Sequence, residues 1–183
     1  MKEKNSGQKL AKILIMGLEN SGKTSIVLSL TRNTNLLSYC SLKPTVGINR
    51  VKFEEEESDT QFSIWDFGGQ KQYRKDYLND LDKHLIGIDK LIYVIDVQDG
   101  EKYDLTLQFL ENIVNFLKKI EDSFEFLIFL HKFDPGLEKL DQYSDEMISS
   151  NLINKISKII PSDFNYKIFK TTIYTVFHKV LVS

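Results

Sequence analysis

The sequence predicts an α/β fold in which helices flank a mostly parallel β-sheet. Three observations lead to this fold class. Short apolar runs alternate with longer stretches of helical periodicity along the 183 residues, which is typical of α/β proteins. A glycine-rich loop separates the first apolar run from the first helical stretch, and polar residues follow several of the other runs. Because ligands of such sheets bind beyond the carboxyl ends of the strands, we expect a site at that edge.

Six apolar runs are predicted to be strands, at residues 10–16, 50–55, 61–65, 91–96, 125–131 and 167–171. Only a short polar link separates the runs 50–55 and 61–65, so they are expected to form an antiparallel hairpin within an otherwise parallel sheet. Helices are predicted at residues 23–31, 71–84, 104–120, 144–159 and 173–182. The expected architecture is a six-stranded sheet flanked by about five helices. Residues 10–183 would form this one domain, and residues 1–9 a flexible N-terminus.

The composition limits the classes of partner. A net charge of −2 and a pI of about 6.0 give no indication of nucleic-acid binding. The apolar runs are too short to cross a bilayer, and the sequence shows no signal peptide, no glycine at position 2 and no C-terminal prenylation cysteine. A cytoplasmic location without a direct membrane anchor is therefore expected. The single cysteine, Cys40, excludes an internal disulfide, and the composition indicates no particular oligomeric state.

Residues 17–24 read Gly-Leu-Glu-Asn-Ser-Gly-Lys-Thr, a complete G-x-x-x-x-G-K-[ST] motif. Gly17 and Gly22 let the backbone turn so that successive N–H groups point at one anion. Lys23 is expected to bind the β- and γ-phosphates of a nucleotide, and the Thr24 hydroxyl to ligate Mg²⁺. The N-terminus of the following helix adds its dipole. The other residues of this loop that we expect to contact nucleotide are Glu19, Asn20, Ser21 and Ser25.

Polar residues that follow later strands are predicted to reach the same edge of the sheet. Asp66 ends the run 61–65 and is expected to hold Mg²⁺ directly or through water, although a carboxylate there also suits a simple strand-end cap. Gly69 can offer an unobstructed backbone N–H to a γ-phosphate. Gln70 is placed to orient an attacking water, and an ordinary surface glutamine is the alternative. The segments 131–134 and 171–172 follow the last two predicted strands.

The segment Trp-Asp-Phe-Gly-Gly-Gln at 65–70, with Pro-Thr-Val-Gly at 44–47, resembles the small GTPases of the Arf and Rag branches. The phosphate loop is similar to the Arf-like form, whereas His-Lys-Phe-Asp at 131–134 and Thr-Thr-Ile-Tyr at 171–174 resemble the Rag form. The resemblance covers residues 10–181. It implies a P-loop NTPase fold of the Ras-like G-domain type, with GTP or GDP as ligand and Mg²⁺ as cofactor.

The resemblance also implies roles for single residues. Thr45 would bind Mg²⁺ and the γ-phosphate only in the triphosphate state. Asp134 would accept hydrogen bonds from N1–H and the exocyclic amine of guanine, while the Lys132 stem packs on the base. The backbone of Thr171 and Thr172 would touch the base oxygen. A partly exposed apolar patch read by effectors would consist of Ile48, Trp65 and Tyr77, although a buried aromatic is an equally good reading of Trp65.

Four residues depart from the family pattern or bear on it. His131 replaces the usual asparagine, and it either contacts the nucleotide or holds the loop. Glu19 stands near the γ-phosphate, where many small GTPases have glycine. Leu42 occupies the position of the internal arginine of heterotrimeric α-subunits. Arg74 is the nearest other arginine and is expected to be a solvated residue of the switch helix, so we expect an activating partner.

The predicted function is a switch that binds GTP or GDP and hydrolyses GTP slowly, with Lys23, Thr45 and Gln70 as catalytic residues. Activating, exchange and effector proteins are expected at the moving segments 33–47 and 67–80. One alternative is a scaffold that holds nucleotide with negligible hydrolysis. A P-loop kinase is a weaker alternative, because such kinases carry arginine-rich lids and this chain has only Arg32, Arg50 and Arg74 as its arginines.

Overall fold

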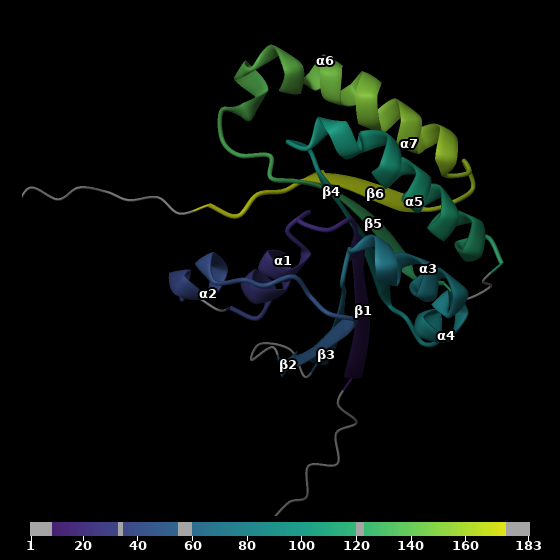
Figure 1. Cartoon of the computed structure of the whole chain (residues 1–183). Helices are drawn as coiled ribbons and strands as arrows, with labels where there is room; N and C mark the ends of the chain where they lie inside the picture. The colour runs from purple at the N-terminus through teal and green to yellow at the C-terminus, as the bar shows by residue number, and fades with distance from the viewer. Residues whose placement is uncertain (1–8, 33–34, 55–59, 120–122, 175–183) are drawn as a thin grey trace, which may run out of the picture.

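A computed structural model describes residues 9–32, 35–54, 60–119 and 123–174 of the chain. Within these residues six strands form one sheet in the order β2-β3-β1-β4-β5-β6 (Figure 1). The β2–β3 pair is antiparallel and the other pairs are parallel. The strands are β1 (Lys9–Gly17), β2 (Ile48–Glu54), β3 (Thr60–Phe67), β4 (Lys90–Asp96), β5 (Glu125–His131) and β6 (Tyr166–Lys170).

Helices lie on both sides of this sheet. In Figure 1, α1 and α2 stand to the left of β1, and α3 to α7 stand to its right and above it. No helix in the described ranges is long and apolar enough to cross a membrane. The helices are α1 (Lys23–Leu30), α2 (Leu36–Cys40), α3 (Lys71–Asn79), α4 (Leu81–Leu85), α5 (Tyr103–Leu117), α6 (Asp145–Ile148) and α7 (Asn154–Ile159), with a π-helical turn (Ser149–Ile153) between the last two and 3₁₀ segments at Gly100–Lys102, Leu137–Lys139 and Asp141–Tyr143.

The predicted fold class is confirmed, with differences in the helices. The helix predicted at 71–84 is broken at Asp80, whose backbone leaves the helical region (φ −110°, ψ 13°) and lies between α3 and α4. Asn79 and Asp80 are both poor helix formers, which favours a break there. Helix α2 was not predicted, because five mostly exposed residues carry no periodic signal. The helix predicted at 173–182 and the flexible segment 1–9 fall almost wholly outside the described residues.

The sheet is buried on both faces at its centre. Leu14, Ile15 and Met16 are consecutive in β1 and each is 0% exposed, as expected for a central parallel strand covered on both sides. Leu14 and Met16 belong to a large core cluster that includes residues of α3 to α5 and α7. Ile15 belongs to a smaller cluster with Ile26 of α1. Both clusters hold β1 rigidly, and its end at Gly17 therefore gives the phosphate loop a fixed starting point.

The burial of α5 leads to a stability prediction. Leu110 is 0% exposed and Leu105, on the same helix, is 39% exposed. We expect Leu110→Ala to lower the free energy of unfolding by about 2–5 kcal/mol, because it removes packed methyl groups and leaves a cavity. The matched control Leu105→Ala should cost less than about 1 kcal/mol. Urea unfolding followed by circular dichroism measures both, and equal losses in the two variants would contradict the described packing of α5.

Candidate nucleotide-binding site

The phosphate loop turns tightly between β1 and α1. Gly17 has φ +147°, Gly22 has φ +90° and Asn20 has φ +62°, a region that side chains other than glycine rarely adopt. A Cβ at Gly17 would also collide with the carbonyl oxygen of Val94 on the neighbouring strand. No side chain caps the first turn of α1. Its first N–H groups are therefore free to donate to an anion bound in the loop.

Lys23 lies inside this loop. Its Nζ donates to the carbonyl oxygen of Leu18 at 2.6 Å and lies 3.5 Å from Oγ of Ser21. Burial of the ammonium lowers the pKa of Lys23 to about 8, against the opposing effects of Asp66 and Glu19. A bound anion would favour the charged form and raise that pKa again. The side chain therefore has the burial and the charge of a phosphate ligand.

Three side chains from three segments meet at the end of β3. The Oδ2 atom of Asp66 accepts from the Thr24 hydroxyl at 2.7 Å and from the Thr45 hydroxyl at 3.1 Å. The two hydroxyl oxygens are 3.0 Å apart. Asp66 is 0% exposed, and burial raises the pKa of its carboxyl group, while the hydroxyl of Thr24 and the charge of Lys23 lower it. Its Oδ1 atom is buried without a hydrogen-bond partner among the described residues.

The segment after β3 packs onto the phosphate loop. A Cβ at Gly69 would collide with the backbone of Leu18 and Glu19, so only glycine allows this approach. Buried side-chain oxygens without a partner in the described part of the chain occur here too, on Glu19 (Oε2) and Gln70 (Oε1). A cleft of about 430 Å³ opens beside them; its lining includes Lys23, Thr24, Thr45, Gly69 and Gln70. Unpaired buried polar atoms around a cleft of ligand size suit a polar ligand.

The loop before β2 is fixed at its C-terminal end, at Gly47. The carbonyl oxygen of Gly47 accepts from the backbone N–H of Gly68 at 2.9 Å and from the Tyr77 hydroxyl at 2.7 Å. Burial raises the pKa of Tyr77 to about 12, so its phenol stays protonated and keeps donating. Tyr77 is only 6% exposed and lies inside the protein, which leaves Ile48 and Trp65, both half-buried, as the accessible members of the predicted effector patch.

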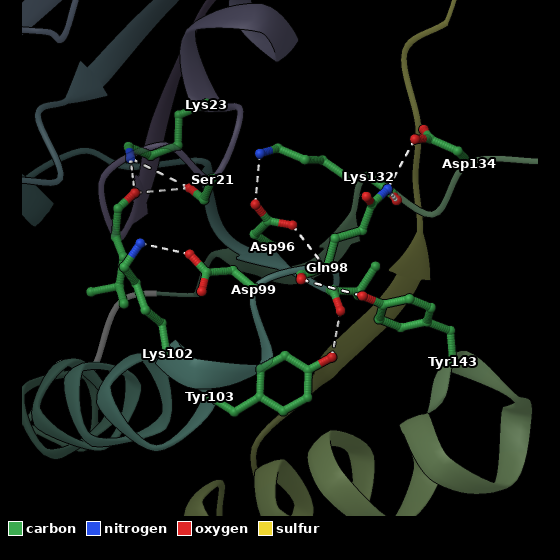
Figure 2. A network of polar contacts seen from close by, with 12 residues as sticks. Ser21, Lys23, Asp96, Gln98, Asp99, Lys102, Tyr103, Lys132, Asp134 and Tyr143 are labelled. Carbon is green, nitrogen blue, oxygen red and sulfur yellow. Dashed lines mark hydrogen bonds and ion pairs between the residues drawn. The ribbon is translucent and has the colours of Figure 1, made fainter. Parts of the chain in front are cut away.

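The residues predicted to bind the base lie at the ends of β5 and β6. Asp134 Oδ1 accepts from the Thr172 hydroxyl at 2.5 Å, and Lys132 Nζ pairs with Asp96 Oδ2 at 2.6 Å. Lys132 and Asp134 are labelled in Figure 2, on the far side of Asp96 from Lys23 and Ser21. The cleft described above is lined by phosphate-loop and switch residues, and Asp134 is not among them. The residues predicted to bind phosphate and those predicted to bind the base therefore form two groups, which we call the phosphate half and the base half.

His131 joins the two halves. Its ring is 3% exposed, and its Nδ1 lies 2.9 Å from the Thr171 hydroxyl. The other side of the ring lies where a Cβ of Gly22 would be, so the ring packs directly against the phosphate loop. Burial, and to a smaller extent the charge of Lys132, lowers the pKa of His131. This arrangement supports the reading in which His131 holds the loop.

Two site residues were missed by the sequence analysis. Asp96 ends β4 and Gln98 follows it, and both contact the base half. They lie at the carboxyl end of a strand, as the other site residues do. That rule was applied to β1, β3, β5 and β6, and its application to β4 would have found Asp96, the last residue of that strand.

The expectation about Arg74 needs revision, and the surroundings of Trp65 can be described more closely. Arg74 is 9% exposed rather than solvated, and its guanidinium lies 5.8 Å from the ring centre of Phe109 on α5. The expectation was wrong because Arg74 lies with Tyr77 on the buried face of α3. Two cations lie over the ring of Trp65: the Arg50 guanidinium at 3.9 Å and the Lys12 ammonium at 4.2 Å from the ring centroid. The surroundings of Trp65 therefore include basic groups and the ring of His84.

The fold and the site define a class of protein: a Ras-like GTPase fold with a P-loop, a strand-end aspartate and a Lys-x-Asp segment at one edge of its sheet. Residues 12–182 match the Gtr1/RagA G protein conserved region. This chain belongs to that family. The Arf/Rag-type G domain predicted from its motifs is thereby confirmed.

Curated relatives and solved structures agree with this assignment. ADP-ribosylation factor-like protein 3 of Caenorhabditis elegans is 35% identical over 99 residues, or 54% of this chain and 48% of that protein. ADP-ribosylation factor-like protein 2 of Arabidopsis thaliana is 35% identical over 108 residues, or 58% of this chain and 52% of that protein. The chain thus spans about half the length of the curated relatives it matches.

Two solved structures share the fold. The Arl6 BBS3 small GTPase from Trypanosoma brucei, solved with the nucleotide analogue GppNp, superposes with a TM-score of 0.64 at 20% identity, covering 90% of this chain and 87% of that one. The mammalian SRP receptor structure gives a TM-score of 0.62 at 13% identity, covering 88% and 90% of the two chains. At these identities the likeness concerns the fold alone.

The buried ring of His131 leads to a pH prediction. Its pKa is lowered in the folded state, so the unfolded chain binds more protons near and below its ordinary value of about 6.5, and stability falls as pH falls through that range. His131→Asn should therefore lose less free energy of unfolding than the wild type between about pH 7.5 and pH 5.5. Urea titrations at both values measure the difference.

The control for this prediction is His84→Asn. Burial also lowers the pKa of His84, but this ring lies half-buried beside Trp65 and Phe67, away from the phosphate loop. The control should remove only the contribution of His84 to the change of the free energy of unfolding with pH. An unchanged slope in His131→Asn would contradict a buried neutral ring at position 131.

Proposed function

We propose that this chain is a small GTPase that acts as a molecular switch, binding GTP or GDP with Mg²⁺ and hydrolysing GTP slowly. The observation that carries the proposal is the contact of Thr24 and Thr45 with Asp66. Thr45 comes from the loop before the edge strand β2, and Thr24 from the phosphate loop. A sensor of the γ-phosphate requires a side chain that reaches the phosphate loop from another, movable loop, as Thr45 does from the loop before β2.

The residues at this contact fit a magnesium ion. Mg²⁺ prefers oxygen ligands in octahedral geometry at about 2.0–2.1 Å, so that neighbouring ligands are about 3 Å apart. The Thr24 and Thr45 hydroxyl oxygens are 3.0 Å apart, and the buried Oδ1 of Asp66 is without a partner among the described residues. Thr24 and Thr45 would hold the ion and Asp66 would hold it directly or through water. When bound, the ion would neutralise charge on the phosphates.

Each half of the site has a part in the proposed binding. The N–H groups of the phosphate loop and Lys23 would bind the β- and γ-phosphates, and Gly69 would present its N–H to the γ-phosphate. Asp134 would accept from N1–H and the amine of guanine, and the Lys132 stem would pack on the base. Among the other predicted contacts, Thr171 and Thr172 are engaged through their side chains with His131 and Asp134.

Hydrolysis would be an in-line attack of water on the γ-phosphate, oriented by Gln70. Lys23 and the loop N–H groups would stabilise the charge that develops on the phosphate oxygens. Leu42, not an arginine, lines the cleft on the switch side. An arginine supplied by a partner contributes on the order of 10³–10⁵ in rate, so we propose an activating protein. Loss of the γ-phosphate would release Thr45 and Gly69, and segments 33–47 and 67–80 would change conformation.

Effector recognition would use the surface around Trp65 and Ile48. The indole of Trp65 lies with Arg50 and Lys12 over its ring. A partner for this surface would match it with apolar and acidic groups. Exchange proteins would act on the same switch segments.

The test of base and nucleotide choice is competition binding. Purified protein stripped of nucleotide is loaded with fluorescent GDP in the presence of Mg²⁺ and challenged with GDP, GTP, ADP and ATP. We expect the guanine nucleotides to compete at least about a hundredfold more strongly than the adenine nucleotides, because Asp134 repels the N1 acceptor of adenine. Asp134→Ala should remove most of this preference. Equal competition by ATP would overturn the guanine assignment.

The catalytic role of Gln70 separates a switch from a scaffold. Single-turnover hydrolysis of loaded GTP should be slow in the wild type and at least about tenfold slower in Gln70→Leu, because the variant cannot orient the water. Gln72→Leu, which replaces an exposed glutamine of α3, is the matched control and should keep the wild-type rate. Negligible hydrolysis in the wild type and in Gln70→Leu alike would support the alternative of a nucleotide-binding scaffold.

A further inference from the structure

Gln98 lies between the two residues that are proposed to recognise the base. Its Nε2 donates to the carbonyl oxygen of Lys132 at 2.7 Å and to Oδ2 of Asp134 at 2.9 Å. Both protons of the side-chain amide are therefore in use. Figure 2 shows Gln98 below Lys132, reaching from the loop after β4 toward the segment after β5. No motif of the sequence points to this residue.

The main chain of Gln98 is fixed as well. Its N–H donates to Oδ1 of Asp96 at 2.9 Å, and its carbonyl oxygen accepts from the Tyr143 hydroxyl at 3.3 Å. On the preceding residue, the carbonyl oxygen of Val97 accepts from the Tyr103 hydroxyl at 2.5 Å. These contacts hold Gln98 at both its backbone and its amide, so its side chain can fix the position of the groups it contacts.

The two contacts of Asp134 leave its carboxylate open for a base. Thr172 donates to Oδ1 and Gln98 donates to Oδ2. A carboxylate has about four lone-pair sites, two on each oxygen. One site therefore remains on each oxygen, and these two can accept a pair of parallel N–H groups. Guanine presents such a pair, N1–H and the exocyclic amine.

The backbone of Lys132, whose carbonyl oxygen accepts from Gln98, is in a rare conformation. Lys132 has φ +62° without being glycine, and such a conformation persists only where the surroundings fix it. Asp96 holds the Lys132 ammonium at 2.6 Å, and Gln98 holds the Lys132 carbonyl oxygen. Asp96 at the end of β4 and Gln98 in the loop after it therefore hold Lys132 at its side chain and at its backbone, and through Lys132 they fix the path of the chain from the end of β5 to Asp134.

We propose that Gln98 is a positioning residue for base recognition: it orients the Asp134 carboxylate so that one oxygen meets the exocyclic amine of guanine. The inference rests on the proposed function, since it concerns the choice of base by the same site. Gln98 acts through Asp134 and Lys132 and does not itself touch the nucleotide. Loss of the Gln98 side chain should weaken the discrimination between nucleotides with different bases more than it weakens the binding of the phosphates.

The test compares GDP with IDP, whose hypoxanthine base lacks the exocyclic amine. Affinities of both nucleotides are measured with Mg²⁺ by competition against fluorescent GDP. Gln98→Ala should weaken the binding of GDP about tenfold, because it removes one hydrogen bond to a charged group. The binding of IDP should weaken by clearly less. The ratio of GDP to IDP affinity should therefore fall. A change that only disturbs the fold would weaken both nucleotides equally.

Two further variants sharpen the comparison. Gln98→Glu keeps the size of the side chain but places a carboxylate beside Asp134, so it should lower the ratio at least as far as Gln98→Ala does. Gln108→Ala removes an exposed glutamine of α5 and should leave both affinities unchanged. Circular dichroism and the melting temperature of each variant show whether it folds.

The outcomes separate this inference from the function on which it rests. An equal loss for GDP and IDP in Gln98→Ala would overturn it, because the side chain would then be merely structural. Tighter GDP binding in that variant would overturn it as well, by showing that Gln98 competes with the base for Asp134. A wild-type protein that binds ADP as tightly as GDP would overturn the proposed function, and the role of Gln98 with it.

Discussion

The buried carboxylate of Asp66 is the group on which the phosphate half of the site depends. In the sheet, Asp66 pairs with Ile15 of β1 on one side and Asn49 of β2 on the other. It is 0% exposed, and a buried carboxylate is costly unless donors or opposite charges surround it. Thr24, Thr45 and the charge of Lys23 meet part of that requirement. The remaining oxygen has no partner among the described residues, and a divalent cation would supply one.

The two halves of the site are built in different ways. The phosphate half depends on close backbone packing as well as on its side chains: a Cβ at Gly17, Gly22 or Gly69 would strain the chain or collide with its neighbours. The base half is made of side chains that hold one another, through contacts between the ends of β4, β5 and β6. Anions of many kinds fit the first construction, whereas the second can distinguish one base from another.

This difference explains how much the sequence could predict. Backbone-built parts need glycine at fixed spacing, so residues 17–24 and 66–70 could be located without a structure, as could the strands that carry them. The side-chain network could be located only in part. Asp134 stands in a motif, but Gln98 is a common residue in an ordinary loop, and its role depends on where β4 places it beside β5. Contacts of this kind depend on the register of the sheet, which no local pattern encodes.

The same reasoning applies to the cationic residues. Arg74 looks like a surface residue in sequence because the α3 region is rich in charge, and its position near Phe109 follows from which face of α3 is turned to the core. Arg50 is the cross-strand partner of Trp65 in the β2–β3 hairpin, so that cation–aromatic contact could have been expected once the hairpin was predicted. Lys12 reaches the same ring from β1, and only the order of the strands places it there.

His131 contacts both the phosphate half and the base half of the site. Its ring packs on Gly22 and its Nδ1 lies near the Thr171 hydroxyl. The backbone of Thr171 in turn accepts a hydrogen bond from the N–H of Phe133 and donates one to the carbonyl oxygen of Leu130. A displacement of the phosphate loop at Gly22 would therefore displace the base half as well. Thr45 and Gly69 do not belong to this set of connected residues. Thr45 contacts Asp66, and the backbone of Gly69 lies against the phosphate loop. The residues that would hold a nucleotide are thus connected to one another, while Thr45 and Gly69, which would sense its γ-phosphate, contact them at these two points. That division is what allows a switch to change conformation without releasing its ligand.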